Sequence, residues 1–260
     1  MSTWGKELWT YRELFYSFVW RDLKVKYKQS LMGVGWALIQ PLFAMIIFTV
    51  FFGRLAKMPS DGHPYPVFSY AGLLPWTYFA AAVGMAGNSV VMHSNMVRKV
   101  YFPRVALPMA AVLSHLVDFC VAAVLLVGLM LYYDVAFTSS LLFLPVLVAA
   151  LILLTAGVGM FFAALNVRYR DVKFALPFVI QLWMFATPVI YPLTIVPEGY
   201  RPLFALNPLA GIIDAFRACV FASRDLDLQV LGISLATTAA VFMLGTMYFK
   251  RTERWFADVI

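Results

Sequence analysis

The chain has 260 residues, of which 63% are hydrophobic and 13% charged. Soluble globular domains contain roughly half apolar residues, so this composition excludes an ordinary soluble domain and predicts an integral membrane protein. The formal net charge of +7 is compatible with nucleic-acid binding. Cytoplasmic Lys and Arg in the loops of a membrane protein produce the same excess, however, and this origin is favoured here.

The first 30 residues combine an apolar helical stripe with a basic end. At 100° per residue, one face gathers Trp4, Leu8, Tyr11, Leu14, Phe15, Phe18 and Val19. This pattern predicts an amphipathic helix lying in the membrane surface. Continuing the same helix would place Asp22 and Lys26 on the apolar side, so we expect it to turn, end or change partner near Arg21 and Asp22. Residues 22–29 then form a short polar segment, which we call the elbow.

Four basic residues lie in the elbow or just before it, immediately ahead of an apolar run: Arg21, Lys24, Lys26 and Lys28. No nucleic-acid-binding module surrounds them, so a nucleic-acid partner is not predicted. Each base near anionic lipid contributes about 1 kcal/mol to membrane binding. Lipid anchoring alone, and lipid anchoring combined with docking of another protein, both remain open.

Six apolar runs are long enough to cross a bilayer as helices of about 20 residues. They cover residues 33–53, 68–92, 105–133, 141–165, 174–196 and 229–249. Alternate summation of the Lys and Arg outside these runs gives 15 on the side of the two termini and 5 on the other. The asymmetry predicts that both termini and the loops around 98–104 and 168–173 are cytoplasmic.

A seventh apolar segment, residues 207–223, is too short for a convincing span. It carries Asp214 and Arg217 on one helical face, and it opens with Asn207 and Pro208. We therefore expect an extracytoplasmic re-entrant or interfacial helix, with Asn207 as N-cap and Pro208 at the first helical position. No internal repeat is evident. The prediction is one all-α membrane domain over residues 1–260, with six spans within 33–249 and a cytoplasmic tail at 250–260.

Motifs for enzymatic chemistry are absent from the sequence. No G-x-x-x-x-G-K-[ST] loop occurs, so any ATP must be used by another subunit. The three histidines lack metal-ligand spacing, and Cys120 and Cys219 are far apart and form no recognisable pair. We expect no metal and no cofactor in this chain.

One acidic side chain lies deep in a predicted span. This is Asp118, with His115 one helical turn before it on the same face. An intramembrane carboxylate serves either a function such as proton relay or a structural hydrogen bond to a neighbouring helix. A proton-coupled carrier is expected to hold more than one such group, which favours the structural role.

Two stripes at helical spacing combine aromatic rings with an amide. The first contains Trp36, Gln40, Phe43 and Phe51, and the second contains Phe174, Phe178, Gln181 and Phe185. Aromatic faces pack against the C–H faces of sugar rings, while amides bond the hydroxyl groups. A sugar path and ordinary helix packing in lipid are both open for each stripe.

Six blocks, in order, resemble the permease subunit of bacterial polysaccharide-exporting ABC transporters of the O-antigen and teichoic-acid type. They are RDLKVKYKQSLMGVGWALIQPL, YAGLLPWTYF, NMVRKVYFPRVALP, ALNVRYRDVKF, TPVIYPL and LNPLAGIIDAFR. The resemblance implies six transmembrane helices, an N-terminal interfacial helix and short re-entrant helices before the last span. It also implies a homodimer in the bacterial cytoplasmic (inner) membrane, bound to two ATPase subunits that hold ATP and Mg²⁺.

The same resemblance implies three contacts with the ATPase. A coupling loop over residues 95–104 would offer Arg98, Lys99, Phe102, Pro103 and Arg104. The elbow would offer Arg21, Asp22, Lys24 and Lys28, and a third loop Arg168, Arg170 and Asp171. The implied substrate is a polysaccharide on a polyprenyl-diphosphate lipid, moved outward through a channel between two permeases. A drug or lipid exporter of the same fold, and a polyprenyl-phosphate sugar transferase, are the alternatives.

Overall fold

The computed structural model describes residues 10–28, 33–221 and 226–256, and every regular element in these ranges is a helix. The predicted all-α class is therefore confirmed. In chain order the α-helices are α2 (Arg12–Lys28), α3 (Gly35–Phe48), α4 (Tyr65–Met92), α5 (Ser94–Lys99), α6 (Ala106–Tyr132), α7 (Leu144–Arg168), α8 (Val172–Ala186), α9 (Arg201–Ala205), α10 (Pro208–Phe221) and α11 (Leu228–Thr252). Short helical turns are η1 (Thr49–Leu55), η2 (Ser139–Phe143), η3 (Leu193–Ile195), η4 (Glu198–Tyr200) and η5 (Glu253–Trp255).

Four helices in the described part of the chain are long and apolar enough to cross a membrane. They are Gly35–Leu55, Ala106–Tyr132, Ser139–Arg168 and Leu228–Trp255, which match four of the six predicted runs. The count reaches five if Glu198–Ala205 and Pro208–Phe221, bent by 113°, form one span. α4 is 28 residues long, but its tyrosines, glycines and asparagine make it less apolar.

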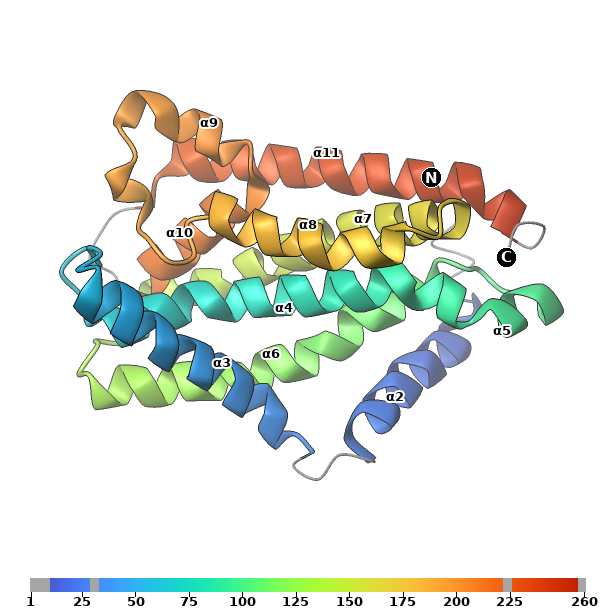
Figure 1. Ribbon diagram of the computed structural model, residues 1–260, viewed down its shortest axis with the longest axis horizontal. Coiled ribbons are helices and arrows are strands. Elements are labelled where there is room, and N and C mark those ends of the chain that lie inside the picture. Colours follow the sequence, from blue (N-terminus) through green and yellow to red (C-terminus); the bar gives the residue numbers. More distant parts are fainter. Residues whose placement is uncertain (1–9, 29–32, 222–225, 257–260) are drawn as a thin grey trace.

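α4 lies at the centre of the bundle, with α7 on one side and α6 on the other (Figure 1). Its polar groups bond inward rather than facing lipid. The hydroxyl of Tyr70 donates to the carbonyl of Ala122 at 2.9 Å, and that of Tyr78 donates to the carbonyl of Val112 at 3.2 Å. Asn166 on α7 donates to the carbonyl of Gly87 at 3.0 Å. Burial among neighbouring helices explains how a less apolar helix occupies the core.

Two glycines allow α7 and α11 to cross at backbone contact. A Cβ added to Gly157 would lie 2.6 Å from the Cα of Phe242, and one added to Gly245 would clash with the carbonyl of Gly157. Small residues at a crossing let helix backbones approach closely, which drives packing where the hydrophobic effect is weak. The pair therefore fixes α11 against the bundle.

The loops fall into two groups at opposite ends of the bundle (Figure 1). α5, the turn between α7 and α8, and the end of α11 share one end. The turn between α6 and α7 and helices α9 and α10 lie toward the other. This grouping agrees with the two sides assigned from the Lys and Arg count.

The predicted run 174–196 is wrong as a continuous helix, because α8 ends at Ala186. The chain then carries Pro188 and Pro192, each of which removes a backbone donor and disfavours helix in the residue before it. Arg217 of α10 satisfies the freed carbonyls: its guanidinium donates to Pro188 at 2.7 Å, Val189 at 2.5 Å and Tyr191 at 3.1 Å. Irregular backbone inside a membrane protein requires such partners.

A turn or an end near Arg21 and Asp22 is also wrong, because α2 runs without interruption to Lys28. The remaining alternative, a change of partner, agrees with the contacts: Phe18 packs on Phe102, whereas Lys26 bonds to Asp118 on α6. The charged residues Arg21, Asp22 and Lys26 form ion pairs and so do not interrupt the helix. Arg21 donates to the adjacent Asp22 at 2.8 Å, and Lys26 pairs with the carboxylate of Asp118 on α6. α2 lies obliquely across the end of the bundle and packs on α6, with Phe18 buried (Figure 1). Trp4, Leu8 and Gln29 lie outside the described residues.

The expected cap at Asn207 is confirmed. Its side-chain oxygen accepts a hydrogen bond from the backbone N–H of Leu209 at 3.3 Å, and α10 begins at Pro208. The same oxygen accepts from the indole of Trp183 at 3.0 Å, and its amide nitrogen donates to Thr187 at 2.9 Å. Asn207 therefore joins α10 to the end of α8. Nearly all of α10 is buried, including Asp214 and Arg217.

Candidate functional site

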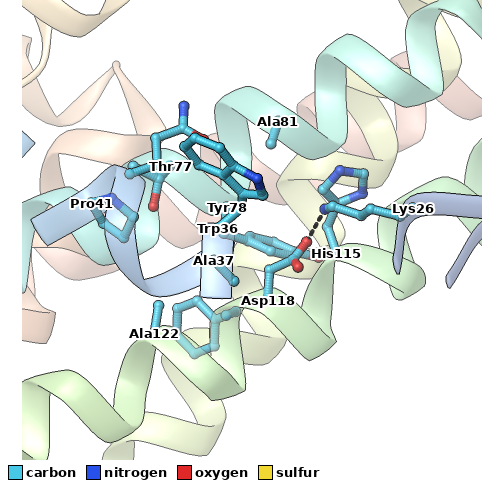
Figure 2. Close-up of a pocket in the computed structure, with 12 residues that line it drawn as sticks. Lys26, Trp36, Ala37, Pro41, Thr77, Tyr78, Ala81, His115, Asp118 and Ala122 are labelled. Atoms are coloured by element: carbon cyan, nitrogen blue, oxygen red, sulfur yellow. Dashed lines mark hydrogen bonds and ion pairs between the residues drawn. The ribbon is translucent and has the colours of Figure 1, made fainter. Parts of the chain in front are cut away.

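A pocket of about 130 Å³ forms where the elbow, α3, α4 and α6 meet. Figure 2 shows side chains from all four segments converging on it. Its lining combines polar and aromatic groups: Lys26, Trp36, Gln40, Thr77, Tyr78, His115, Asp118 and Phe119, with alanines and Pro41 between them. The pocket therefore brings together residues that the sequence placed in three separate predictions: the elbow, the first stripe and the intramembrane polar pair.

Asp118 is the polar centre of this pocket. Its two carboxylate oxygens accept from the ammonium of Lys26 and from the hydroxyl of Tyr27, neighbouring residues in the last turn of α2. The side chains of Lys26 and Asp118 are 42% and 19% exposed, so the pair is only partly buried. Burial and the Asp118 carboxylate raise the pKa of the Tyr27 hydroxyl, which keeps it protonated as a donor.

His115 completes the polar wall one turn before Asp118. Its Nδ1 contacts the carbonyl of Ala111 at 2.8 Å, and the ring is buried. Asp118 thus bonds to a neighbouring helix, the arrangement that the sequence favoured over a proton relay. In the part of the chain that the structure describes, no group of three His, Cys, Asp or Glu residues has the geometry of a metal site.

The first stripe divides between the pocket and the outer surface. Trp36 and Gln40 line the pocket, although the side chain of Trp36 is still 54% exposed. Phe43 and Phe51, further along α3 and η1, point to the exterior and are 60% and 57% exposed. In Figure 2 the indole of Trp36 stands between α4 and the Asp118 side of the pocket.

The second stripe, on α8, does not reach this pocket. Phe174, Phe178 and Phe185 are exposed, and Gln181 shares their exposed surface. Both stripes therefore present aromatic rings to the outside of one subunit, where lipid, a second copy or a substrate would contact them. Their role in a substrate path remains a prediction.

The coupling-loop residues separate into exposed and internal groups. Arg98 and Lys99 are exposed at the end of α5. Phe102 is buried with its ring 5.6 Å from that of Phe18 on α2, edge to face. The backbone N–H of Arg104 donates to the carboxylate of Glu253 at 3.0 Å, and its guanidinium donates to the carbonyl of that residue. Phe102 and Arg104 thus link the loop to α2 and η5, while Pro103 between them is half-buried.

The other proposed contact residues lie at the surface or near it. Lys24 is exposed, with its ammonium 5.5 Å from the centre of the Trp20 ring, and Lys28 is exposed as well. Arg168, Arg170 and Asp171 are exposed in the turn between α7 and α8. Exposure alone does not test whether a residue contacts a partner. The role of these residues in ATPase binding therefore remains a prediction.

A second cavity, of about 310 Å³, lies at the opposite end of the bundle beside α10. Its walls include Asp61, His63, Thr194, Asp214 and Arg217. Thr194 donates to Asp61 at 2.6 Å, and the His63 ring stacks on Phe221 at 4.2 Å. Burial lowers the pKa of His63, and the nearby Asp61 carboxylate partly opposes this shift.

Sequence reasoning missed the roles of Lys26, Tyr27 and Arg217. The partners of Lys26 and Tyr27 lie 92 and 91 residues away, on α6. Arg217 bonds to carbonyls 26 to 29 residues away, and at 3.3 Å to the carbonyl of Phe68, 149 residues away. The one feature of the local sequence that pointed to these contacts was the charge of Arg217, because an Arg within an apolar helix needs internal partners.

Comparison with known proteins places this architecture among transporters. Residues 13–221 match the family described as ABC-2 type transporter. The chain is 31% identical to the O-antigen export system permease protein RfbA of Myxococcus xanthus over 98% of both chains. It is 29% identical to the protein of the same name from Klebsiella pneumoniae over 92% of both. It is 21% identical to the polysialic acid transport protein KpsM of Escherichia coli, over 90% of this chain and 91% of the relative. The chain therefore belongs to the ABC-2 type transporter family, whose members are membrane transport components rather than enzymes.

Proposed function

We propose that this chain is the permease subunit of an ATP-driven exporter for a lipid-linked, O-antigen-like polysaccharide. The observation that carries the proposal is the 31% identity to an O-antigen export permease along 98% of both chains. Similarity that extends through every helix and loop implies the same architecture, not merely one shared segment. The polymer is attached to a polyprenyl diphosphate and moves outward across the bacterial inner membrane.

In this proposal the subunit crosses the membrane six times, with α4 and the short α8 added to the four long apolar helices. α4 has the length to span, since 28 residues of helix extend about 42 Å. α8 has 15 residues and is followed by backbone that Arg217 satisfies, so it spans as a helix plus an irregular segment. Both termini are cytoplasmic, on the same side of the membrane as α5.

Two copies of the chain form the channel, and two ATPase subunits bind on the cytoplasmic side. ATP and Mg²⁺ are held by those ATPases, because this sequence has no P-loop. The exposed aromatic rings of α3, η1 and α8 support a path between copies: they are large, lie outside the subunit core, and each stripe includes one amide. Weak stacking contacts repeated along such a path let a polymer slide without being trapped.

Coupling to ATP hydrolysis passes through α5 and the elbow. Phe102 and Phe18 are in edge-to-face contact, so a push on the loop that follows α5 is transmitted directly to α2. Arg98 and Lys99 offer two cations at the exposed tip of this unit. Cations at the cytoplasmic entrance also suit a diphosphate headgroup.

The test is reconstitution. We expect the chain to copurify with ABC-type ATPase subunits from its own organism, and to export lipid-linked polysaccharide in proteoliposomes only when ATP is present. Transport by the chain alone, or the absence of any ATPase complex, would overturn the proposal.

Two sets of variants locate the path and the coupling surface. Phe43→Ala and Phe178→Ala should slow polymer export while insertion and assembly stay normal, whereas Phe143→Ala, at another exposed phenylalanine, should not. Unchanged export in both stripe variants would show that the stripes only pack. Arg98→Glu with Lys99→Glu should weaken the ATPase complex, and Lys57→Glu at an exposed loop residue should leave it intact.

A further inference from the structure

The ion pair of Lys26 and Asp118 joins two elements that are otherwise held mainly by apolar contacts. Asp118 lies in the middle of α6, within a stretch of apolar residues. Lys26 and Tyr27 are consecutive residues in the last turn of α2, and both bond to it. One carboxylate therefore takes two donors from the same short segment, which fixes the direction of that segment as well as its distance from α6.

The charged and titratable groups around this carboxylate come from three helices. α2 supplies Lys26 and Tyr27, α6 supplies His115, and α4 supplies Tyr78, whose hydroxyl is occupied by the carbonyl of Val112. Among the residues described in this pocket, Lys26 is the only Lys or Arg. The side chains of the pair are 42% and 19% exposed, so removing one partner loses the contact without leaving the other charge fully buried.

α3 reaches the same pocket from another side. Trp36 and Gln40 of α3 line it together with Lys26 and Asp118. α3 packs on both α4 and α6, the helix that carries Asp118. The contact of α2 with Asp118 therefore lies directly beside the start of α3.

We propose that Asp118 is a positioning residue for transport: by holding Lys26 and Tyr27 it fastens the last turn of α2 to α6, at the pocket that Trp36 and Gln40 also line. The transport role rests on the proposed function above, whereas the fastening itself does not. Because the pair is partly exposed, it holds this turn without locking it permanently. A push on α2 from the coupling loop is thus passed to α6 through this contact.

The fastening is tested first without transport. Hydrogen–deuterium exchange is measured on the protein in lipid nanodiscs. Asp118→Asn and Lys26→Gln should each speed exchange of the α2 amides about tenfold, and leave α4 unchanged. Lys28→Gln is the matched control, since Lys28 lies in the same turn and is exposed. Equal exchange in all variants, or equal acceleration by Lys28→Gln, would overturn the proposal.

The transport role is tested with the ATPase complex in proteoliposomes. Lys26→Gln, Asp118→Asn and the double variant should lower the amount of polymer exported per ATP hydrolysed to a similar extent, because all three remove one interaction. Lys26→Arg should retain coupling, and the swap of Lys26→Asp with Asp118→Lys should restore part of it. A structural role alone would instead lower insertion and ATPase binding together.

The outcomes separate the two hypotheses. If α2 loosens as expected but the wild-type complex exports no polysaccharide, the fastening stands and the proposed function fails. If the wild-type complex exports polysaccharide and Asp118→Asn exports it with the same coupling, the positioning role fails and the proposed function stands.

Discussion

Replacing Arg217 with Met should destabilise the end of the bundle where α10 meets α4 and the segment after α8. Arg217 is 5% exposed, and its guanidinium donates to four backbone carbonyls, those of Phe68, Pro188, Val189 and Tyr191. It also lies 3.8 Å from the centre of the Phe68 ring. Methionine fills a similar volume but donates no hydrogen bond.

The expected loss is about 3 to 5 kcal/mol of unfolding free energy. Three of the carbonyls lie outside helices, and leaving a buried acceptor unsatisfied costs about 1 to 3 kcal/mol each. Removing the guanidinium also removes the cost of burying its charge, which offsets part of this sum. For a chain of this size the loss corresponds to a fall in Tm of roughly 6 to 20 °C.

The assay is thermal unfolding of the purified protein in nanodiscs, followed by intrinsic fluorescence. Arg201→Met is the matched control, because Arg201 donates to one carbonyl at 3.1 Å and, among the described residues, forms an ion pair with the exposed Glu198. This control should cost about 1 kcal/mol. A Tm for Arg217→Met within 2 °C of the Arg201→Met value would refute the argument that the carbonyls depend on Arg217.

Three further outcomes follow from particular contacts. Gly245→Ala should destabilise the α7–α11 crossing by about 1 to 3 kcal/mol, measured as Tm, whereas Gly232→Ala on the same helix, with open space at its Cβ, should be neutral or stabilising. Asn207→Ala should cost about 1 to 2 kcal/mol and change the fluorescence of Trp183, which loses its acceptor; an unchanged spectrum would contradict the bond. Burial lowers the pKa of His63, so the unfolded chain binds its proton more readily, and unfolding free energy should fall as pH drops through about 6.5; His63→Gln should flatten this dependence in Tm-versus-pH profiles.

Local rules predicted the elements whose formation depends on local sequence. The runs 105–133, 141–165 and 229–249 correspond to α6, α7 and α11 within a few residues, because long apolar segments must be helical in a membrane. The cap at Asn207 was predictable for the same reason: its acceptor bonds a backbone N–H two residues away.

The errors arise where distant residues decide the local structure. α2 continues past Asp22 because Lys26 reaches Asp118, and no pattern within α2 contains that information. Pro188 and Pro192 mark the end of α8 locally, but the irregular backbone that follows is satisfied by Arg217, 29 residues after Pro188. Trp36 and Gln40 were identified as a stripe, but their union with Asp118 in one pocket required the packing of α3 on α4 and α6.

The central position of α4 has a consequence for biosynthesis. This helix leaves the ribosome before α6, α7 and α10, the helices that cover it. Until they follow, the hydroxyls of Tyr70 and Tyr78 lack the carbonyls of Ala122 and Val112. A nascent chain that ends just after α4 thus exposes polar groups to hydrocarbon. α4 should therefore remain beside the insertion machinery until α6 emerges, and only then pass with it into the lipid.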